Sequence, residues 1–209
     1  MIIEGIVITT NAEGQAHLSP MGPVIDLQQQ QIELRPFGGS VTLSNLIAHP
    51  YGVFHCTDDA LMIVQAVTKR WVEEPQLVPA QSLPGWVLPA ACVWHEFACG
   101  FVDQSSNRAV VLGKIRHTGR GPDFTGFNRA KHGLIEAAIT ISRLQFLPAE
   151  EIEQSLQVAA RLVDKTGSSR ERLALDLLQT HFAEHQLAQS TPNHCNEANA
   201  RQPETREPR

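Results

Sequence analysis

The sequence predicts an α+β protein whose strand-rich first part forms a small antiparallel barrel and whose second part is helical. In residues 1–118, β-branched and aromatic segments alternate with glycine, proline and asparagine turns, a pattern typical of short strands. Residues 127–187 instead place apolar side chains at helical spacing. The chain has 209 residues, of which 42% are hydrophobic and 19% charged, so it can fold as one sizeable domain or two small ones.

Six strands are predicted in the first part. Residues 2–9 and 15–21 flank the turn sequence Asn-Ala-Glu-Gly and predict a hairpin. Residues 86–102 are long enough to require a bend or a bulge. The other strands are predicted over residues 31–35, 51–57 and 108–117.

Two short helices are expected between the strands, over residues 40–48 and 59–68, and both follow plausible N-cap residues. Three longer helices are expected after residue 126. They cover residues 127–146, a segment from Pro148 to a stop at Gly167, and a segment capped by Ser168 or Ser169 with an apolar stripe of Leu173, Leu177, Leu178 and Phe182.

These elements predict three regions along the chain. Residues 1–126 form a barrel domain, residues 127–188 form a helical segment packed on it, and residues 189–209 form a disordered tail that lacks large apolar side chains.

Charge and composition exclude several classes of function. The net charge of −5 offers no general attraction for nucleic acid. The longest apolar run, near residues 86–94, is too short to span a membrane, and no secretory signal is evident, so a cytoplasmic protein is expected. Cys56, Cys92 and Cys99 are read as buried thiols, because their spacing suggests no disulfide framework. His181 and His185 lack a third ligand, so no metal site is expected.

Residues 34–46 have the outline of an anion-binding turn. A strand ends, Gly38 and Gly39 turn the chain, and a hydroxyl-rich helix begins. The unpaired N–H groups at a helix start favour a phosphate, and Arg35 can add a two-pronged donor. The same pattern also fits an ordinary helix cap at Ser40 beside a surface arginine. The spacing alone leaves both interpretations open.

Several motifs occur together in order: MIIEGIV at residues 1–7, SPMGP at 19–23, the LRPF…S…T…NL segment at 34–46, and FHCTDD at 54–59. With FNRAKH at 127–132, they resemble the DUF447 proteins, a branch of the FMN-binding split-barrel superfamily that includes flavin reductases. The resemblance extends over residues 1–188. It implies a six-stranded antiparallel split β-barrel with a C-terminal helical segment, usually a homodimer, with FMN bound near the subunit interface.

The resemblance also implies which residues contact FMN. The phosphate-side motif is matched by Arg35, Ser40, Thr42 and Asn45. Met21 and Gly22 would lie beside the isoalloxazine ring. Thr57 and Asp58, at a strand end, would complete the rim of the site, although a strand-end Thr-Asp-Asp also fits plain helix capping.

Catalytic residues are harder to assign from the sequence. His132 and Glu136 are one helical turn apart, with Arg129 nearby, so His132 and Arg129 are candidates to clamp a substrate or transfer a proton; a structural salt bridge or hydrogen bond is the alternative. Many nicotinamide-using flavin reductases carry Gly-Asp-His before a late barrel strand, where this chain has Asp-Gln-Ser at 103–105. That departure argues against NAD(P)H as the direct hydride donor.

The expected function is therefore that of an FMN-dependent oxidoreductase acting on a small molecule. The resemblance suggests a pterin-like substrate, although no residue demonstrates one. The alternative is a non-catalytic FMN carrier or a dimeric binding module without turnover.

Overall fold

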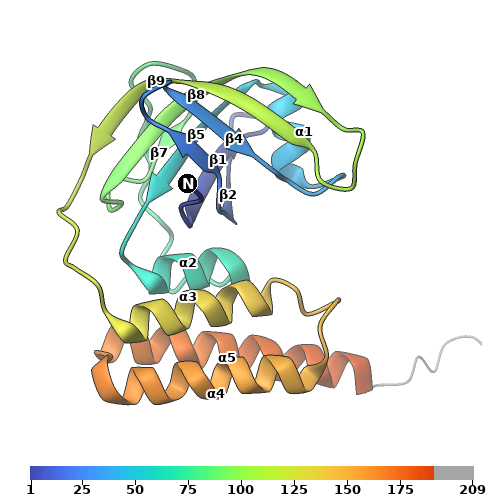
Figure 1. Ribbon diagram of the computed structural model, residues 1–209, viewed down its shortest axis with the longest axis vertical. Coiled ribbons are helices and arrows are strands. Elements are labelled where there is room, and N and C mark those ends of the chain that lie inside the picture. The colour runs from blue at the N-terminus through green and yellow to red at the C-terminus, as the bar shows by residue number, and fades with distance from the viewer. Residues whose placement is uncertain (191–209) are drawn as a thin grey trace, which may run out of the picture.

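The computed structural model describes residues 1–190 as a curled sheet above a layer of helices (Figure 1). Along the described chain the elements are β1 (Gly5–Thr10), β2 (Ala16–Met21), β3 (Val24–Asp26), β4 (Gln31–Leu34), α1 (Val41–Ala48), β5 (Tyr51–Cys56), α2 (Ala60–Thr68), β6 (Val78–Pro79), β7 (Trp86–Val87), β8 (Val93–Asp103), β9 (Val110–Arg120), α3 (Arg129–Ile141), α4 (Ala149–Thr166) and α5 (Ser169–Ser190).

The main sheet is antiparallel and has the strand order β2-β1-β5-β8-β9-β4-β3. The edge strand β3 lies close to β1, because the residues that precede β1 in sequence pair with β3. Ile2 bridges to Val24, and the Ile25 N–H donates to the Met1 carbonyl at 3.1 Å. The sheet thus curls into a split barrel, as the sequence predicts.

The strand count differs from the prediction of six. The sheet has seven strands, because β3, only three residues long, was too short to detect between its flanking turns. The predicted strand over residues 86–102 is wrong in its first half. The chain leaves β7 at Leu88, turns through Pro89 with the Ala91 N–H donating to the Leu88 carbonyl at 3.0 Å, and starts β8 at Val93. The expected irregularity occurs inside β8, where the register to β9 shifts twice.

Strand β1 is buried on both faces, which explains its nearly continuous apolar sequence. Val7 packs with Phe54 and Phe97 in the barrel core. Ile6 and Ile8 point the other way, into a cluster that contains Met62 of α2. The barrel and the adjoining helix therefore share β1 as a common wall.

The helices begin and end near the predicted residues, with two corrections. α3 ends at Ile141 rather than near residue 146, where a series of turns replaces it. On α5, Leu178 and Phe182 are buried as expected, but Leu173 is exposed and Ala174 takes the buried position. The start of α5 is fixed by Ser168, whose N–H donates to Glu171 Oε2 at 2.8 Å in a capping box.

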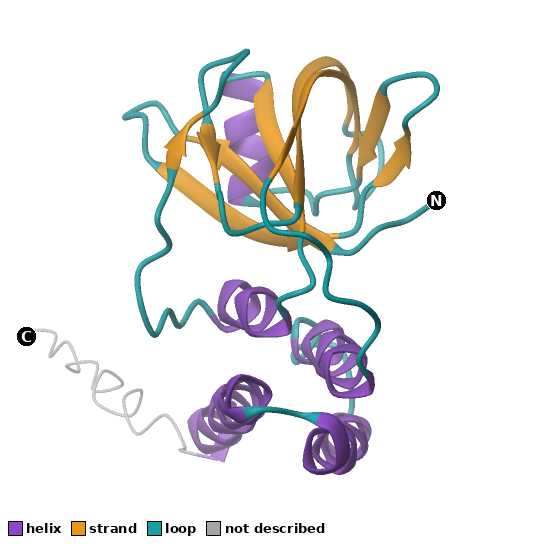
Figure 2. Cartoon of the chain, turned by 90° about the vertical axis from the view of Figure 1, so that its left-hand side faces the viewer, coloured by secondary structure: helices purple, strands orange, loops and turns teal. Residues whose placement is uncertain are grey.

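Helices α2 to α5 share one core, although α2 lies within the strand-rich part of the chain. α2 and α3 lie between the barrel and the other two helices (Figures 1 and 2). Two ion pairs join the end of β5 to the helical segment: Lys131 Nζ lies 3.3 Å from Asp58 Oδ2, and the Arg170 guanidinium contacts both carboxylate oxygens of Asp59.

Helix α5 continues to Ser190, so the tail predicted from residue 189 starts two residues inside it, and the rest of that tail lies outside the described residues. Within residues 1–190, no helix is long and apolar enough to cross a membrane.

Candidate functional site

A cavity of about 450 Å³ lies between the split barrel and the helical layer, within the range of roughly 300–1,000 Å³ usual for ligand sites. Its barrel wall comes from the start of β1, the end of β2 and the chain around α1, and its helical wall comes from α2, α3 and the turn that follows. The barrel wall consists of Ile2, Glu4, Gly5, Ser19, Pro20, Met21, Gly22, Arg35, Pro36, Phe37, Ser40, Thr42 and Arg108.

The turn into α1 forms one end of the cavity. Gly39 has a φ of +74°, a conformation that glycine adopts without steric cost. The Ser40 N–H donates to the Phe37 carbonyl at 3.1 Å, and Ser40 Oγ accepts from the Leu43 N–H at 3.3 Å. Since the first N–H groups of a helix have no helical acceptor, the start of α1 is suited to an anion. Thr42 lines the cavity there, although only 2% of it is exposed.

Two arginines lie at the same end. Arg35 Nε donates to Glu33 Oε1 at 2.6 Å, and its side chain is 62% exposed, so its terminal nitrogens remain accessible. The Arg108 guanidinium lies over the Phe37 ring, 4.1 Å from its centroid. This end of the cavity therefore combines hydroxyl groups with positive charge.

Glu4 supplies the acidic group of the cavity. Its carboxylate lies against the backbone of Gly22, since a Cβ placed on Gly22 would fall 2.6 Å from Glu4 Oε1. Partial burial raises the pKa of Glu4, the Glu136 carboxylate raises it further, and the Arg143 guanidinium opposes both. Glu4 thus faces Gly22 on one side and α3 on the other.

Five of the eight residues predicted to contact FMN line this one cavity: Met21, Gly22, Arg35, Ser40 and Thr42. Asn45 does not. It is buried one turn further along α1, where Nδ2 donates to Thr9 Oγ1 at 3.0 Å and fastens α1 to β1.

Thr57 and Asp58 also lie outside the cavity lining. Thr57 Oγ1 accepts from the Asp59 N–H at 3.1 Å. Asp58 Oδ2 accepts from the Thr125 N–H at 2.9 Å and pairs with Lys131. Burial raises the pKa of Asp58, but the Thr125 and Lys131 hydrogen bonds outweigh it and hold the pKa below the ordinary value. A role for either residue in binding FMN stays a prediction.

Arg129 and His132, the two catalytic candidates, are exposed on the first turns of α3 and do not line the cavity. The helix presents later residues instead: Ile135, Ala138 and Ile139, with Arg143 just beyond its end. A catalytic role for Arg129 or His132 stays a prediction.

Sequence reasoning missed three charged residues of the cavity: Glu4, Arg108 and Arg143. Arg108 reaches the α1 turn because the Gly38 N–H donates to the Asn107 carbonyl at 2.9 Å, and Arg143 arrives with the docking of α3. Only the order of motifs could have flagged Glu4, which lies inside the MIIEGIV segment.

Cys56, Cys92 and Cys99 were expected to be buried, but the structure shows them half-buried. Burial raises the pKa of Cys56 to about 11 and that of Cys99 to about 12. Both thiols therefore stay protonated near neutral pH, where a thiolate would be needed for nucleophilic chemistry.

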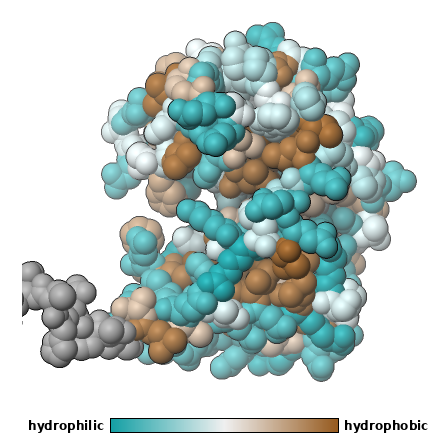
Figure 3. Space-filling view, turned by 180° about the vertical axis from the view of Figure 1, so that it is seen from behind, coloured by the Kyte–Doolittle hydropathy of each residue, from teal (hydrophilic) through white to brown (hydrophobic). Residues whose placement is uncertain are grey.

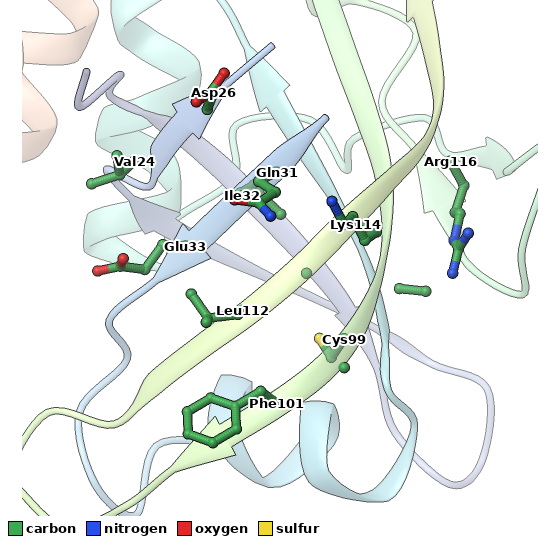
Figure 4. Close-up of a pocket in the computed structure, with 13 residues that line it drawn as sticks. Val24, Asp26, Gln31, Ile32, Glu33, Cys99, Phe101, Leu112, Lys114 and Arg116 are labelled. Atoms are coloured by element: carbon green, nitrogen blue, oxygen red, sulfur yellow. The ribbon is translucent and has the colours of Figure 1, made fainter. Parts of the chain in front are cut away.

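A second cavity, of about 500 Å³, lies on the outer face of β3, β4, β8 and β9 (Figure 4). Phe101, Leu112, Lys114 and Arg116 point into it. It contains none of the residues predicted from the sequence. Among residues 1–190, no group of three or more His, Cys, Asp or Glu side chains is arranged to hold a metal ion.

Two protein-family models match the chain. The family described as protein of unknown function (DUF447), N-terminal domain, matches residues 3–119, and the DUF447 C-terminal family matches residues 128–180. The chain belongs to the DUF447 family. The two matches meet near the boundary between the barrel strands and α3.

Three solved structures are similar to this DUF447 protein to different degrees. An FMN-bound DUF447 protein from Methanosarcina mazei superposes with a TM-score of 0.74 at 20% identity, over 86% of this chain and 94% of the other. An NADH:FAD oxidoreductase from Streptomyces globisporus gives 0.49 at 12% identity, over 58% and 71%. The styrene monooxygenase flavin reductase from Pseudomonas putida gives 0.48 at 14%, over 58% and 82%. No curated protein matches the chain.

Proposed function

We propose that this DUF447 protein binds FMN in the cavity between the barrel and the helices. The observation that carries the proposal is that Met21, Gly22, Arg35, Ser40 and Thr42, separated by turns and strands in sequence, line that single cavity. The FMN-bound relative from Methanosarcina mazei, which has the same fold, supports it.

The residues fit the chemical groups of FMN. The hydroxyls of Ser40 and Thr42 and the guanidinium of Arg35 would hold the phosphate at the start of α1, with Arg108 beside them. Helix starts and arginine forks are the usual partners of phosphate in proteins. The Met21–Gly22 backbone would meet the ring system, since Gly22 has no side chain to block its approach.

We further propose that the protein is an oxidoreductase acting on a small molecule. Bound FMN would supply the hydride or electron transfer, and the chain would position it, exclude water and hold the substrate. The apolar helical wall, formed by Ile63, Val67, Ile135 and Ile139, is suited to the last two tasks. A pterin-like substrate stays one candidate.

The second candidate is a flavin carrier without turnover. It is favoured by one observation, that no histidine lines the cavity among the described residues. Photoreduction of the FMN-loaded protein, followed by reoxidation with quinones, oxidised nicotinamides and oxidised pterins, separates the two. If only one acceptor reoxidises the bound FMN, the enzyme is supported. If none of the acceptors reoxidises it, the carrier is supported.

We also propose a cytoplasmic homodimer. Exposed apolar side chains at the second cavity support the dimer: Phe101 and Leu112 are 53% and 42% exposed. Analytical ultracentrifugation of the wild-type protein and of Leu112→Lys tests this, and a monomer in both cases contradicts it.

The flavin site is tested with Arg35→Ala. Loss of its charged hydrogen bonds should weaken FMN binding by about 1.5–3 kcal/mol, measured by quenching of flavin fluorescence. Glu33→Gln is the matched control, because it removes the carboxylate partner of Arg35 and leaves the guanidinium available. Unchanged affinity in Arg35→Ala, or an equal loss in both variants, contradicts the assignment.

A further inference from the structure

The helical wall of the cavity is apolar and ends in one positively charged side chain. Ile63 and Val67 of α2 and Ile135 and Ile139 of α3 form an apolar surface, and Arg143 lies at its end. Figure 3 shows hydrophobic side chains gathered on both the barrel and the helical parts of one face of the molecule. A ligand against this wall would meet aliphatic side chains along its body and one cation at its end.

Arg143 has no structural task in the described part of the chain. Within residues 1–190, the four ion pairs involve Arg35, Arg70, Lys131 and Arg170, and no side-chain hydrogen bond includes the Arg143 guanidinium. Its backbone carbonyl accepts from the Phe146 N–H at 2.8 Å, which fixes the position of the residue at the end of α3. A cation at a cavity wall that makes no ion pair or side-chain hydrogen bond among the described residues suits an anionic ligand.

Glu4 limits how much negative charge this end can accept. Its carboxylate is electrostatically coupled to Arg143 and lies against Gly22 on the opposite wall. With Glu4 ionised, Glu4 and Arg143 together are neutral, and the Glu136 carboxylate, which also acts on Glu4, adds negative charge nearby. A monoanion is therefore accommodated better than a phosphate dianion, which the barrel end with its two arginines and hydroxyls suits better.

We propose that Arg143 and the apolar helical wall form a subsite for a small monocarboxylic acid with an apolar or aromatic body. This inference rests on the proposed function, since it assigns the substrate class of the same cavity. The carboxylate pairs with Arg143, the body packs on Ile135 and Ile139, and Glu4 lies across from the bound carboxylate as a repelling charge.

The test uses benzoate as the probe and benzyl alcohol as its neutral analogue, titrated into the FMN-loaded protein by calorimetry at pH 7. A shift in the flavin absorbance spectrum is recorded in parallel, which reports binding without any turnover. Benzoate should bind, and benzyl alcohol should bind at least tenfold more weakly. Equal affinities for the two probes overturn the proposal.

Two variants should change benzoate affinity in opposite directions. Arg143→Gln should weaken it about tenfold or more, because the charge-assisted contact is lost. Glu4→Gln should strengthen it about two- to fivefold, because the competing negative charge is gone. Arg161→Gln, on an exposed face of α4, is the matched control and should change nothing. Unchanged affinity in Arg143→Gln, or weaker binding in Glu4→Gln, overturns the subsite.

The failure of this inference is distinguishable from failure of the proposed function. Arg143→Gln should leave FMN affinity unchanged, whereas Arg35→Ala should reduce it. If Arg143→Gln weakens FMN binding as strongly as Arg35→Ala does, Arg143 belongs to the phosphate site and the subsite is wrong. If the protein takes up no FMN but binds benzoate through Arg143, the subsite stands and the flavin function falls.

Discussion

The two walls of the cavity differ in the chemical groups that they present to a ligand. The barrel wall comes from the start of β1, the Met21–Gly22 segment and the start of α1, and it carries hydroxyl side chains and two arginines. The helical wall consists of side chains from α2 and α3 whose backbones are hydrogen-bonded within their own helices. The barrel wall can therefore bind polar groups with fixed donors, while the helical wall offers an apolar surface that can adjust its shape.

Two glycines illustrate this difference. A Cβ on Gly5 in the barrel wall would lie 2.2 Å from the His55 carbonyl oxygen, which strand pairing holds in place. A Cβ on Gly133 in α3 would lie 2.7 Å from Leu162 Cδ1, the end of a flexible side chain. An added methyl group would therefore meet rigid backbone in the barrel wall, whereas in the helical layer a side chain can shift to accommodate it.

The largest expected effect comes from Gly5→Ala. Because the added methyl group would overlap backbone, we expect the free energy of unfolding to fall by about 3 kcal/mol or more, measured by urea denaturation. Gly100→Ala is the matched control, since a Cβ there meets no atom within 4 Å. A loss in Gly5→Ala no greater than that in Gly100→Ala would show that the barrel wall yields and that the comparison is wrong.

Next in size is the pH dependence from His55. Its ring Nε2 accepts from the Leu88 N–H at 3.0 Å, and its Nδ1 lies 3.2 Å from the Ile6 carbonyl. Burial lowers its pKa from 6.5 to about 4. Since the unfolded chain binds a proton near pH 6.5 and the folded protein does not until about pH 4, stability should fall by about 3 kcal/mol as the pH drops across that interval.

Urea denaturation at pH 7, 5.5 and 4.5 measures this slope, and His55→Gln should flatten it. NMR titration of the His55 ring in the wild-type protein provides an independent measurement. A ring that takes up a proton above pH 6 while the protein stays folded would contradict the expected burial.

A smaller effect is expected where the two layers join. Asp58→Asn removes the charge that pairs with Lys131 and accepts from Thr125, so we expect a loss of about 1–2 kcal/mol at pH 7. Because the folded pKa of Asp58 lies below its ordinary value of 3.8, this contribution is present above that value and disappears as the pH falls further.

Thermal denaturation of Asp58→Asn measures the effect, with Asp123→Asn, in the segment between β9 and α3, as the control. Asp123 is exposed, so its variant should match the wild type. If the two variants are equally stable, the Asp58 contacts do not connect the layers energetically.

The smallest effect is expected from Gly133→Ala. The mid-helix alanine gains up to about 1 kcal/mol of helix propensity, and moving the Leu162 side chain offsets part of it. We expect a change between zero and about 1 kcal/mol of added stability by urea denaturation. A loss as large as that in Gly5→Ala would show that the helical layer is as rigid as the barrel wall.

The local parts of this protein could be predicted from its sequence. Ser40 and Asp59 cap α1 and α2 as expected, and the hydroxyl-rich turn after Arg35 does face a cavity. These features depend on residues a few positions apart, whose side-chain and backbone preferences act before any long-range contact forms. Elements without such local signals, such as the three-residue β3, were missed.

The composition of the cavity was decided by tertiary structure. Antiparallel pairing brings Arg108 to the α1 turn, and helix docking brings Arg143 opposite Glu4, across 139 positions of sequence. It also turns Asn45 toward Thr9 and leaves His132 outside. The sequence alone determined where the chain turns and where its helices begin, because those properties are local. Which side chains meet was settled by the packing of apolar faces, whose energy depends on area buried and not on the polar residues carried along with them.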